Sequence, residues 1–244
     1  MNRMLKKTIA FLVILPLVWA WVSCQNATQN PHETMVEVDT LKLIDSTPKQ
    51  DTVIPEPVQK PEPVKKQSQI SEFDKSIKKT AKNIGWDWRL LASLIYQESR
   101  FKTELESEKG AYGLMQLMPV IMEQYDIDYD SSPEEQIAAG GKLIRHLDRC
   151  LEKRVADSSE RVKFVLAAYN AGLGHVYDAQ RLAEKYGKEP DVWTDNVDFF
   201  ILNKSQKEYY NDSCCQNGFL RGTQTYRFVE RVLERYEHYK TIID

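Results

Sequence analysis

Aromatic residues are unevenly distributed along this chain, and their distribution limits where a hydrophobic core can form. The 244-residue sequence has no Phe, Tyr or Trp from residue 25 to residue 69, and this stretch carries Pro-Glu-Pro repeats at residues 55–57 and 61–63. Such a segment buries too little apolar surface to offset the entropy lost on ordering, and alternating proline favours an extended spacer. We therefore predict a disordered Pro/Glu-rich tether over residues 24–69 and one folded domain over residues 70–244.

The N-terminus has the pattern of an export signal. Basic residues precede residues 8–22, an uncharged apolar run that is shorter than the about 20 residues of a membrane-spanning helix. The residues around Cys24 resemble the lipobox of bacterial lipoproteins, although Trp21 stands where that pattern usually has Leu. We predict a lipoprotein signal peptide over residues 1–23, lipidation of Cys24 and a place in the cell envelope, where Gln25 favours the outer membrane over the inner one. A soluble secreted protein and a short uncleaved anchor are the alternatives.

The remainder of the sequence has helical periodicity and no convincing two-residue alternation of the kind that marks strands. Asp87 is placed to cap a helix, and Ser132 followed by Pro133 and Glu135 is a strong helix start. Further helices are predicted over residues 160–171, 175–186, 191–202 and 223–239, with Gly172 and Gly187 as C-terminal caps. The fold class predicted is all-α.

Charge and cysteine content exclude some functions. With 33 Lys and Arg against 36 Asp and Glu, the net charge of −3 gives no basic excess for binding nucleic acid. The four histidines share no metal-ligand spacing, and no cofactor is indicated. In an oxidising compartment Cys150 can form a disulfide with Cys214 or Cys215, and spacing does not choose between them.

One acidic residue continues an apolar stripe. Leu91 and Leu94 lie on the buried face of a predicted helix, and Glu98 follows on the same face, seven residues after the first and four after the second. Burial disfavours the charged form of a carboxyl group, so the pKa of Glu98 should rise, as a general acid requires. The alternative is that Glu98 lies at a fraying helix end, or pairs with Arg100 or another cation.

Two more segments have unusual composition. Residues 110–119, Gly-Ala-Tyr-Gly-Leu-Met-Gln-Leu-Met-Pro, are too Gly-rich for a helix and too apolar for a free loop, and residues 167–172 read Ala-Ala-Tyr-Asn-Ala-Gly. Together with Glu98-Ser99-Arg100-Phe101 and Ser107, these elements stand in the order and internal spacing of the catalytic domain of soluble lytic transglycosylases. The chain from about residue 70 resembles that family, and looks closest to its membrane-bound F-type branch.

The resemblance implies a lysozyme-like helical fold with Glu98 as catalytic residue. It also implies substrate-binding positions, which are Ser107, Gln116, Met118, Tyr169, Asn170 and Tyr226. Ser107 capping a turn and Met118 packing in the core are alternative roles. The family commonly has Glu-Thr-x-x-Tyr-Val near its C-terminus, whereas here residues 224–229 read Gln-Thr-Tyr-Arg-Phe-Val, so Tyr226 would have to replace the tyrosine missing at Phe228.

The activity implied is non-hydrolytic cleavage of the MurNAc-β-1,4-GlcNAc bond of peptidoglycan with formation of a 1,6-anhydroMurNAc end. The implied partners are peptidoglycan glycan strands, a membrane through the N-terminal lipid, and proteins of cell-wall remodelling, the last without a supporting motif. One alternative is a hydrolytic muramidase in which Glu104, Glu106, Glu108 or Asp126 positions a water. The other is a non-catalytic peptidoglycan-binding scaffold.

Overall fold

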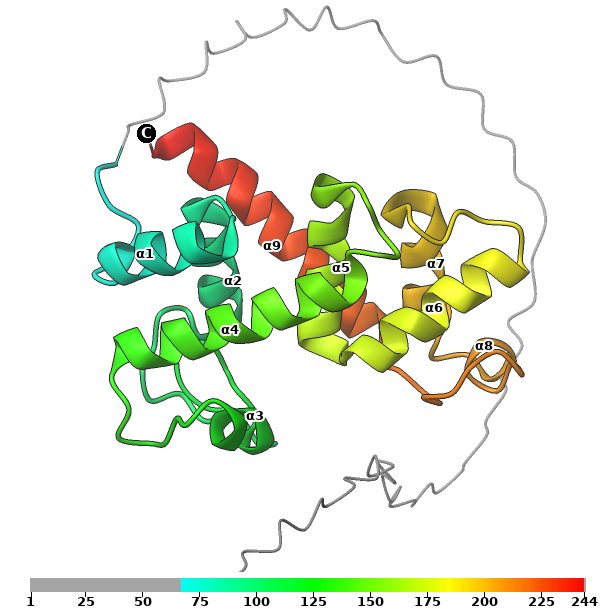
Figure 1. The fold of residues 1–244 in the computed structure, drawn as a ribbon, viewed down its shortest axis with the longest axis horizontal. Coiled ribbons are helices and arrows are strands. Elements are labelled where there is room, and N and C mark those ends of the chain that lie inside the picture. Colours follow the sequence, from blue (N-terminus) through cyan, green and yellow to red (C-terminus); the bar gives the residue numbers. More distant parts are fainter. Residues whose placement is uncertain (1–66, 244) are drawn as a thin grey trace, which may run out of the picture. The chain divides into compact units, whose positions relative to one another are not determined.

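The computed structural model describes residues 67–243, and within them the fold is helical (Figure 1). The elements are α1 (Asp74–Ile84), α2 (Trp88–Ser99), α3 (Pro119–Gln124), α4 (Pro133–Leu151), α5 (Ser158–Ala171), α6 (Leu173–Lys185), the π-type turn η1 (Trp193–Val197), α7 (Asp198–Asn203), α8 (Lys207–Tyr210) and α9 (Gly222–Ile242). Extended pairing in this part of the chain is limited to isolated bridges. The all-α prediction is confirmed for these residues.

The core forms where the apolar faces of the long helices meet. Helix α2 packs against α9 and α1, and α5 packs against α4, α6 and α9. In Figure 1 the C-terminal helix α9 crosses the domain and ends beside α1 and α2. The α2 side chains Leu91, Leu94 and Ile95 are fully buried. Helix α2, whose last turn carries Glu98, therefore packs against both α1 and α9.

The starts of α2 and α4 and the end of α5 follow from predicted caps. Ser132 and Glu135 form the complete capping box at the start of α4, with Pro133 in the first turn. The Asp87 carboxylate accepts a hydrogen bond from the backbone N–H of Arg89 at 2.9 Å. Gly172 ends α5 with a φ of 91°. These local signals were sufficient because each one satisfies backbone groups of its own first or last turn.

The helix predicted over residues 191–202 is wrong in its first half. Thr194 and Asp195 have non-helical backbone angles, and regular helix begins only at Asp198. The side-chain oxygen of Asn196 accepts from the N–H of Glu189, and its amide donates to the carbonyl of Thr194. Asparagine thus binds nearby backbone groups in competition with the helix, which explains the kink.

Several predictions fall outside the described residues. These are the signal peptide at residues 1–23, the lipidation of Cys24 and almost all of the tether at residues 24–69. No helix within residues 67–243 has both the length and the apolar character that crossing a bilayer requires.

The cysteines of the described domain are not bridged. Cys150, Cys214 and Cys215 are free thiols and partly buried, so neither disulfide considered for Cys150 is present. Burial and the neighbouring Asp212 carboxylate raise the pKa of Cys214 to about 12, which keeps that thiol protonated. Its backbone N–H donates to Asp212, which explains why this carboxylate lies so close.

Candidate functional site

Glu98 occupies the last turn of α2, on the buried face that the periodicity indicated. Leu94, one turn earlier, is fully buried, and the next residue, Ser99, is buried and donates to the carbonyl of Ile95 at 3.2 Å. Glu98 itself is partly exposed. Its side chain thus lies at the edge of the core, closely surrounded by protein but still reached by solvent.

The surroundings of Glu98 favour a neutral carboxyl group. Burial raises its pKa to about 8, and no neighbouring charge contributes to that rise. Its position in the last turn acts in the same direction, since the carbonyl end of a helix dipole disfavours negative charge. Within residues 67–243 the carboxyl has no ion pair and no hydrogen bond. The alternative in which Arg100 pairs with Glu98 is not what the structure shows, because Arg100 is exposed and no ion pair joins the two.

The backbone turns sharply directly after this helix. Arg100 and Phe101 have φ values of 53° and 63°, in the left-handed region that residues with a side chain seldom adopt. Two consecutive residues of this kind lead the chain from α2 into the Gly-rich segment. Positions held in such conformations cluster at functional sites in proteins.

The Gly-rich segment folds into a compact loop over residues 105–117. Tyr112 forms isolated antiparallel bridges with Glu106 and Leu117. Gly113 has a φ of 76°, and a Cβ at this position would overlap the side-chain amide of Gln136 from α4. That amide oxygen accepts from the N–H of Leu114 at 2.8 Å. Glycine is therefore required at 113 both by the backbone angle and by the close approach of α4.

Two of the predicted substrate-binding residues stabilise this loop. The Gln116 amide donates to the carbonyls of Leu105 at 2.7 Å and Gly113 at 3.0 Å. Ser107 accepts at its hydroxyl oxygen from the N–H of Ala111 at 2.9 Å, which is the turn-capping role considered for it. Neither side chain forms a hydrogen bond with Glu98 in the structure.

Tyr169 connects the third sequence element to the other two. Its hydroxyl donates to the carbonyl of Met115, within the Gly-rich loop, at 2.6 Å. Burial raises the pKa of the Tyr169 phenol well above its usual value, and the charge of Glu98 raises it further. The fold therefore brings Glu98, the Gly-rich loop and the Tyr-Asn segment into one site.

Asn170 links this site to the start of α9. Its side-chain oxygen accepts from the hydroxyl of Thr225 at 2.9 Å, while its amide nitrogen has no hydrogen bond within the described residues. Thr225 was missed by the sequence argument, although it lies in the same C-terminal motif. Phe228 is buried in the core. Tyr226 lies on the wall of a hollow that Glu98 does not line.

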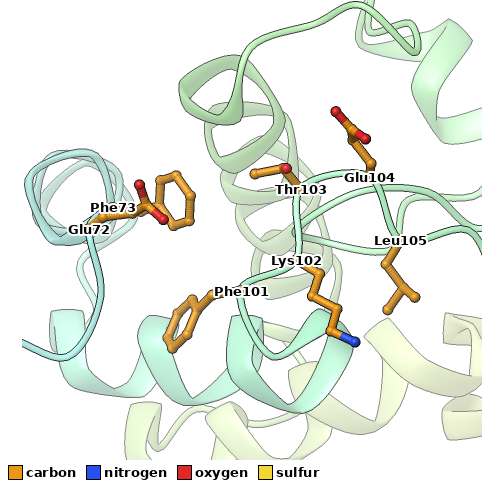
Figure 2. A pocket seen from close by; sticks show the side chains of 7 residues that line it. All are labelled: Glu72, Phe73, Phe101, Lys102, Thr103, Glu104 and Leu105. Carbon is orange, nitrogen blue, oxygen red and sulfur yellow. The ribbon is translucent and has the colours of Figure 1, made fainter.

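A second hollow lies beside the loop that follows Glu98. It has a volume of about 430 Å³ and is bounded by Glu72 and Phe73, before α1, and by residues 101–105 (Figure 2). Glu98 does not line this hollow either. Met118 is partly exposed at the N-cap of α3. Among the residues described, no cluster of His, Cys, Asp or Glu is arranged to hold a metal ion.

Comparison with known proteins places these elements in one family. Residues 75–192 match the family model of the transglycosylase SLT domain. The chain is 34% identical over 171 residues to membrane-bound lytic murein transglycosylase F of Pseudomonas fluorescens, covering 70% of this chain and 34% of that protein. It is 35% identical over 170 residues to the protein of the same name from Desulfosudis oleivorans, covering 70% of this chain and 37% of that protein. The chain thus spans about a third of the length of these relatives.

A solved structure of lytic transglycosylase Slt from Pseudomonas aeruginosa aligns with a TM-score of 0.44 at 20% identity, over 71% of this chain and 25% of that one. The family match covers α1 to α6 and includes Glu98, the Gly-rich loop and Tyr169. Residues 75–192 of the chain therefore form a transglycosylase SLT domain.

Proposed function

We propose that this protein is a peptidoglycan lytic transglycosylase in which Glu98 acts first as acid and then as base. The observation that supports this most directly is the carboxyl group of Glu98, which burial keeps protonated up to about pH 8 beside Tyr169 and the Gly-rich loop. A protonated carboxyl that solvent still reaches can give its proton to a bound sugar.

The reaction needs one carboxyl group. Glu98 protonates the bridging oxygen of the MurNAc-β-1,4-GlcNAc bond as the bond from the anomeric carbon breaks and an oxocarbenium-like centre develops. The resulting Glu98 carboxylate takes the proton of the 6-hydroxyl of the same MurNAc, whose oxygen then bonds to the anomeric carbon. The product is a 1,6-anhydroMurNAc end, and no water is consumed. Attack within one sugar also benefits from the short distance between the reacting groups.

The neighbouring residues receive supporting roles. The free amide nitrogen of Asn170 is available to donate to a substrate carbonyl such as that of an N-acetyl group, and Thr225 fixes its orientation. Tyr169 keeps its proton and holds the loop, and Gln116 and Ser107 maintain the loop's shape. Met118, half-exposed at the edge of this loop, is proposed as a packing contact for the sugar.

The charges around Glu98 favour this reaction over hydrolysis. Glycosidases that use water or a nucleophile place a second carboxylate close to the acid. The four acids considered for that role, Glu104, Glu106, Glu108 and Asp126, are all exposed. None of them contributes to the raised pKa of Glu98.

The cellular setting proposed is the cell envelope. The relatives are named membrane-bound, which agrees with the predicted lipidation of Cys24. We propose attachment through that lipid, at the outer rather than the inner membrane, with peptidoglycan strands as substrate and cell-wall remodelling proteins as partners.

Digestion of purified sacculi tests the reaction. The full-length protein should release muropeptides with anhydroMurNAc ends, identified by mass spectrometry. Glu98→Gln should lower the rate by roughly a thousandfold, the range of a lost general acid, while sedimentation with sacculi is retained. Glu104→Gln, at an exposed acid of the same loop region, should stay within about twofold of wild type.

The other outcomes identify the rival functions. Products with reducing MurNAc ends, lost in Glu104→Gln, would show a hydrolytic muramidase. Retention on sacculi without any released product from the wild type would show a non-catalytic scaffold.

A further inference from the structure

A hollow lined by aromatic rings lies between the end of α6, α7 and the start of α9. Its volume is about 630 Å³. We call it the aromatic hollow, and its lining residues are Tyr186, Lys188, Asp195, Asp198, Phe199, Phe200, Leu202, Tyr209 and Tyr226. In Figure 1 the helices α6, α7 and α8 stand together on the side of the domain away from α1. Apart from Tyr226, none of these residues belongs to the candidate catalytic site.

The rings form a connected cluster that is open to solvent. Phe200 is buried and contacts the rings of Phe199, Tyr186 and Tyr209 at centroid distances of 5.2, 5.7 and 5.8 Å. Phe199 is nevertheless 44% exposed and Tyr186 is 45% exposed. Large apolar side chains exposed together around a concavity mark a binding site more often than a free surface.

Negative charge is concentrated at the same place. Asp195 and Asp198 line the hollow, with Lys188 as the cation among its lining residues. The charge of Glu230 raises the pKa of the Tyr226 phenol, and burial, Asp198 and Asp195 raise it further. Burial raises the pKa of Glu230 itself, the charges of Glu234 and Asp198 add to that rise, and the charge of Lys163 opposes it. Lys185 lies 5.7 Å from the centroid of the Tyr186 ring but is paired with Asp212. The lining residues therefore carry two negative charges against one positive charge, and a bound cation would balance them.

Aromatic faces beside carboxylates are the surroundings that recognise ammonium groups. Asp198 accepts a hydrogen bond from the N–H of Phe199 at 2.7 Å, but a neutral sugar stacked on the rings would bring no positive charge to either carboxylate. The aromatic hollow is also connected to the catalytic residues. Its wall residue Tyr226 follows Thr225, which donates to Asn170, the neighbour of Tyr169. Asn170 and the aromatic hollow are thus linked through consecutive residues of α9.

We propose that the aromatic hollow binds a primary ammonium group on the stem peptide of the peptidoglycan strand. The choice of ligand rests on the proposed function, because the stem peptides of peptidoglycan carry a primary amine on their diamino acid. The rings contact the methylene chain and the face of the ammonium group, while Asp195 and Asp198 supply the opposite charge.

Calorimetric titration with synthetic peptides tests this binding without any turnover. The probe is acetyl-L-Ala-γ-D-Glu-L-Lys-D-Ala, whose amine is on the lysine side chain. The matched control peptide carries an acetyl group on that amine. The full-length protein should bind the amine peptide at least about tenfold more tightly than the acetylated one, and added salt should reduce the difference.

Variants place the binding in the hollow. Asp195→Asn combined with Asp198→Asn, and separately Phe199→Ala, should each weaken binding of the amine peptide about tenfold. The control pair is Glu123→Gln on α3 with Glu152→Gln after α4, which removes two exposed carboxylates away from the hollow and should leave binding unchanged. Circular dichroism melting of each variant separates lost binding from lost folding.

Several results would overturn the proposal. These are equal binding of both peptides, no binding of either, or an affinity that is the same in the Asp195 and Asp198 double variant as in wild type. Displacement of the peptide by chitotriose with no effect of acetylation would identify a sugar site instead. Missing anhydro products from sacculi would contradict the proposed function while leaving the titration result intact.

Discussion

At the scale of single residues, the carboxyl group of Glu98 determines the chemistry open to the site, because burial raises its pKa to about 8. Its position on the stripe of Leu91 and Leu94 follows from helix geometry alone, and burial of that stripe is confirmed. The hydrogen bond between Asn170 and Thr225, 55 residues apart, and the support of the Gly-rich loop by Gln136 depend on tertiary packing. Periodicity identifies the face on which a side chain lies, but it does not identify the side chain opposite.

The raised pKa of Glu98 predicts a pH-dependent effect of Glu98→Gln on stability. Below about pH 4.5 the carboxyl is protonated in both the folded and unfolded states. Between that pH and about 8 the unfolded chain releases the proton and the folded protein retains it, so wild-type stability falls as pH rises. The glutamine amide does not titrate in this pH range, so the variant escapes this loss of stability. The variant should be similar to wild type at pH 4 and more stable by about 2–4 kcal/mol at pH 9.

Urea denaturation of both proteins from pH 4 to pH 9 measures this difference. A stability difference that does not change across the range would contradict the buried, protonated carboxyl.

The raised pKa of Glu98 also predicts how activity falls at high pH. If Glu98 supplies the proton, kcat/KM on a soluble glycan substrate should fall as pH rises through about 8, because the acid is lost in the free enzyme. Release of anhydro products at a series of pH values gives the profile. Tyr169→Ala reduces the burial of Glu98 and should lower the pH at which kcat/KM falls. If that pH does not change, a group other than Glu98 is responsible for the fall.

At the scale of elements, the starts of α2 and α4 were predicted from capping residues that directly precede the helix, whereas Asp157, which caps α5 in the same way, was not recognised and that helix begins two residues before the predicted start. The capping box at Ser132 and the cap at Asp87 are of this kind. The kink at Asp195 was not predicted, because the bond between Asn196 and Glu189 requires the chain to double back. Short helices such as α3 and α8 were also missed, since four to six residues give too little periodicity.

The Gly-rich loop yields a prediction with an internal control. Gly113 and Gly85 have nearly the same φ, 76° and 77°, but only at Gly113 would a Cβ overlap a neighbour, Gln136. Gly85→Ala should therefore cost about 1 kcal/mol for the backbone alone, and Gly113→Ala about 2–4 kcal/mol. Only Gly113→Ala should also lower activity, because its loop is bonded to Tyr169. Thermal denaturation and the sacculus assay measure the two effects, and equal effects at both positions would contradict this account of the loop.

At the scale of the whole molecule, one buried ion pair connects parts of the fold that are distant in sequence. Lys204 and Asp178 are fully buried and lie 2.6 Å apart, joining the end of α7 to α6. Asp178 also accepts from the N–H groups of Gln216 and Asn217, and Lys204 donates to the carbonyl of Gly218. A buried lysine has no signature in the sequence, since its burial depends on a partner that only the fold supplies.

Breaking this pair should reveal how strongly it couples the loop before α9 to the rest of the domain. Lys204→Met removes the fully buried cation beside Asp178 and leaves that carboxylate paired only with Arg181, so the free energy of unfolding should fall by about 3 kcal/mol. Combining it with Asp178→Asn removes both charges, and the double variant should lose clearly less than the sum of the two single variants. Lys240→Met, which breaks an exposed pair with Glu237, serves as the control and should cost at most about 1 kcal/mol.

The pH dependence of the same pair has a defined sign. Burial alone would raise the pKa of Asp178, but the hydrogen bonds from Lys204 and from backbone N–H groups lower it below its ordinary value. The contribution of the Asp178 carboxylate to stability is therefore present above its unfolded pKa near 3.8 and is lost as pH falls through the lower folded pKa. Burial and the charge of Lys204 lower the pKa of His175 to about 4, so His175 is neutral at pH 7 and can accept from Lys204 at 2.9 Å. Acid should therefore destabilise the wild type more than the double variant, and urea denaturation at pH 7 and pH 3 compares them. Additive single-variant effects, or equal acid sensitivity of wild type and double variant, would mean that Asp178 and Lys204 do not act as a coupled pair.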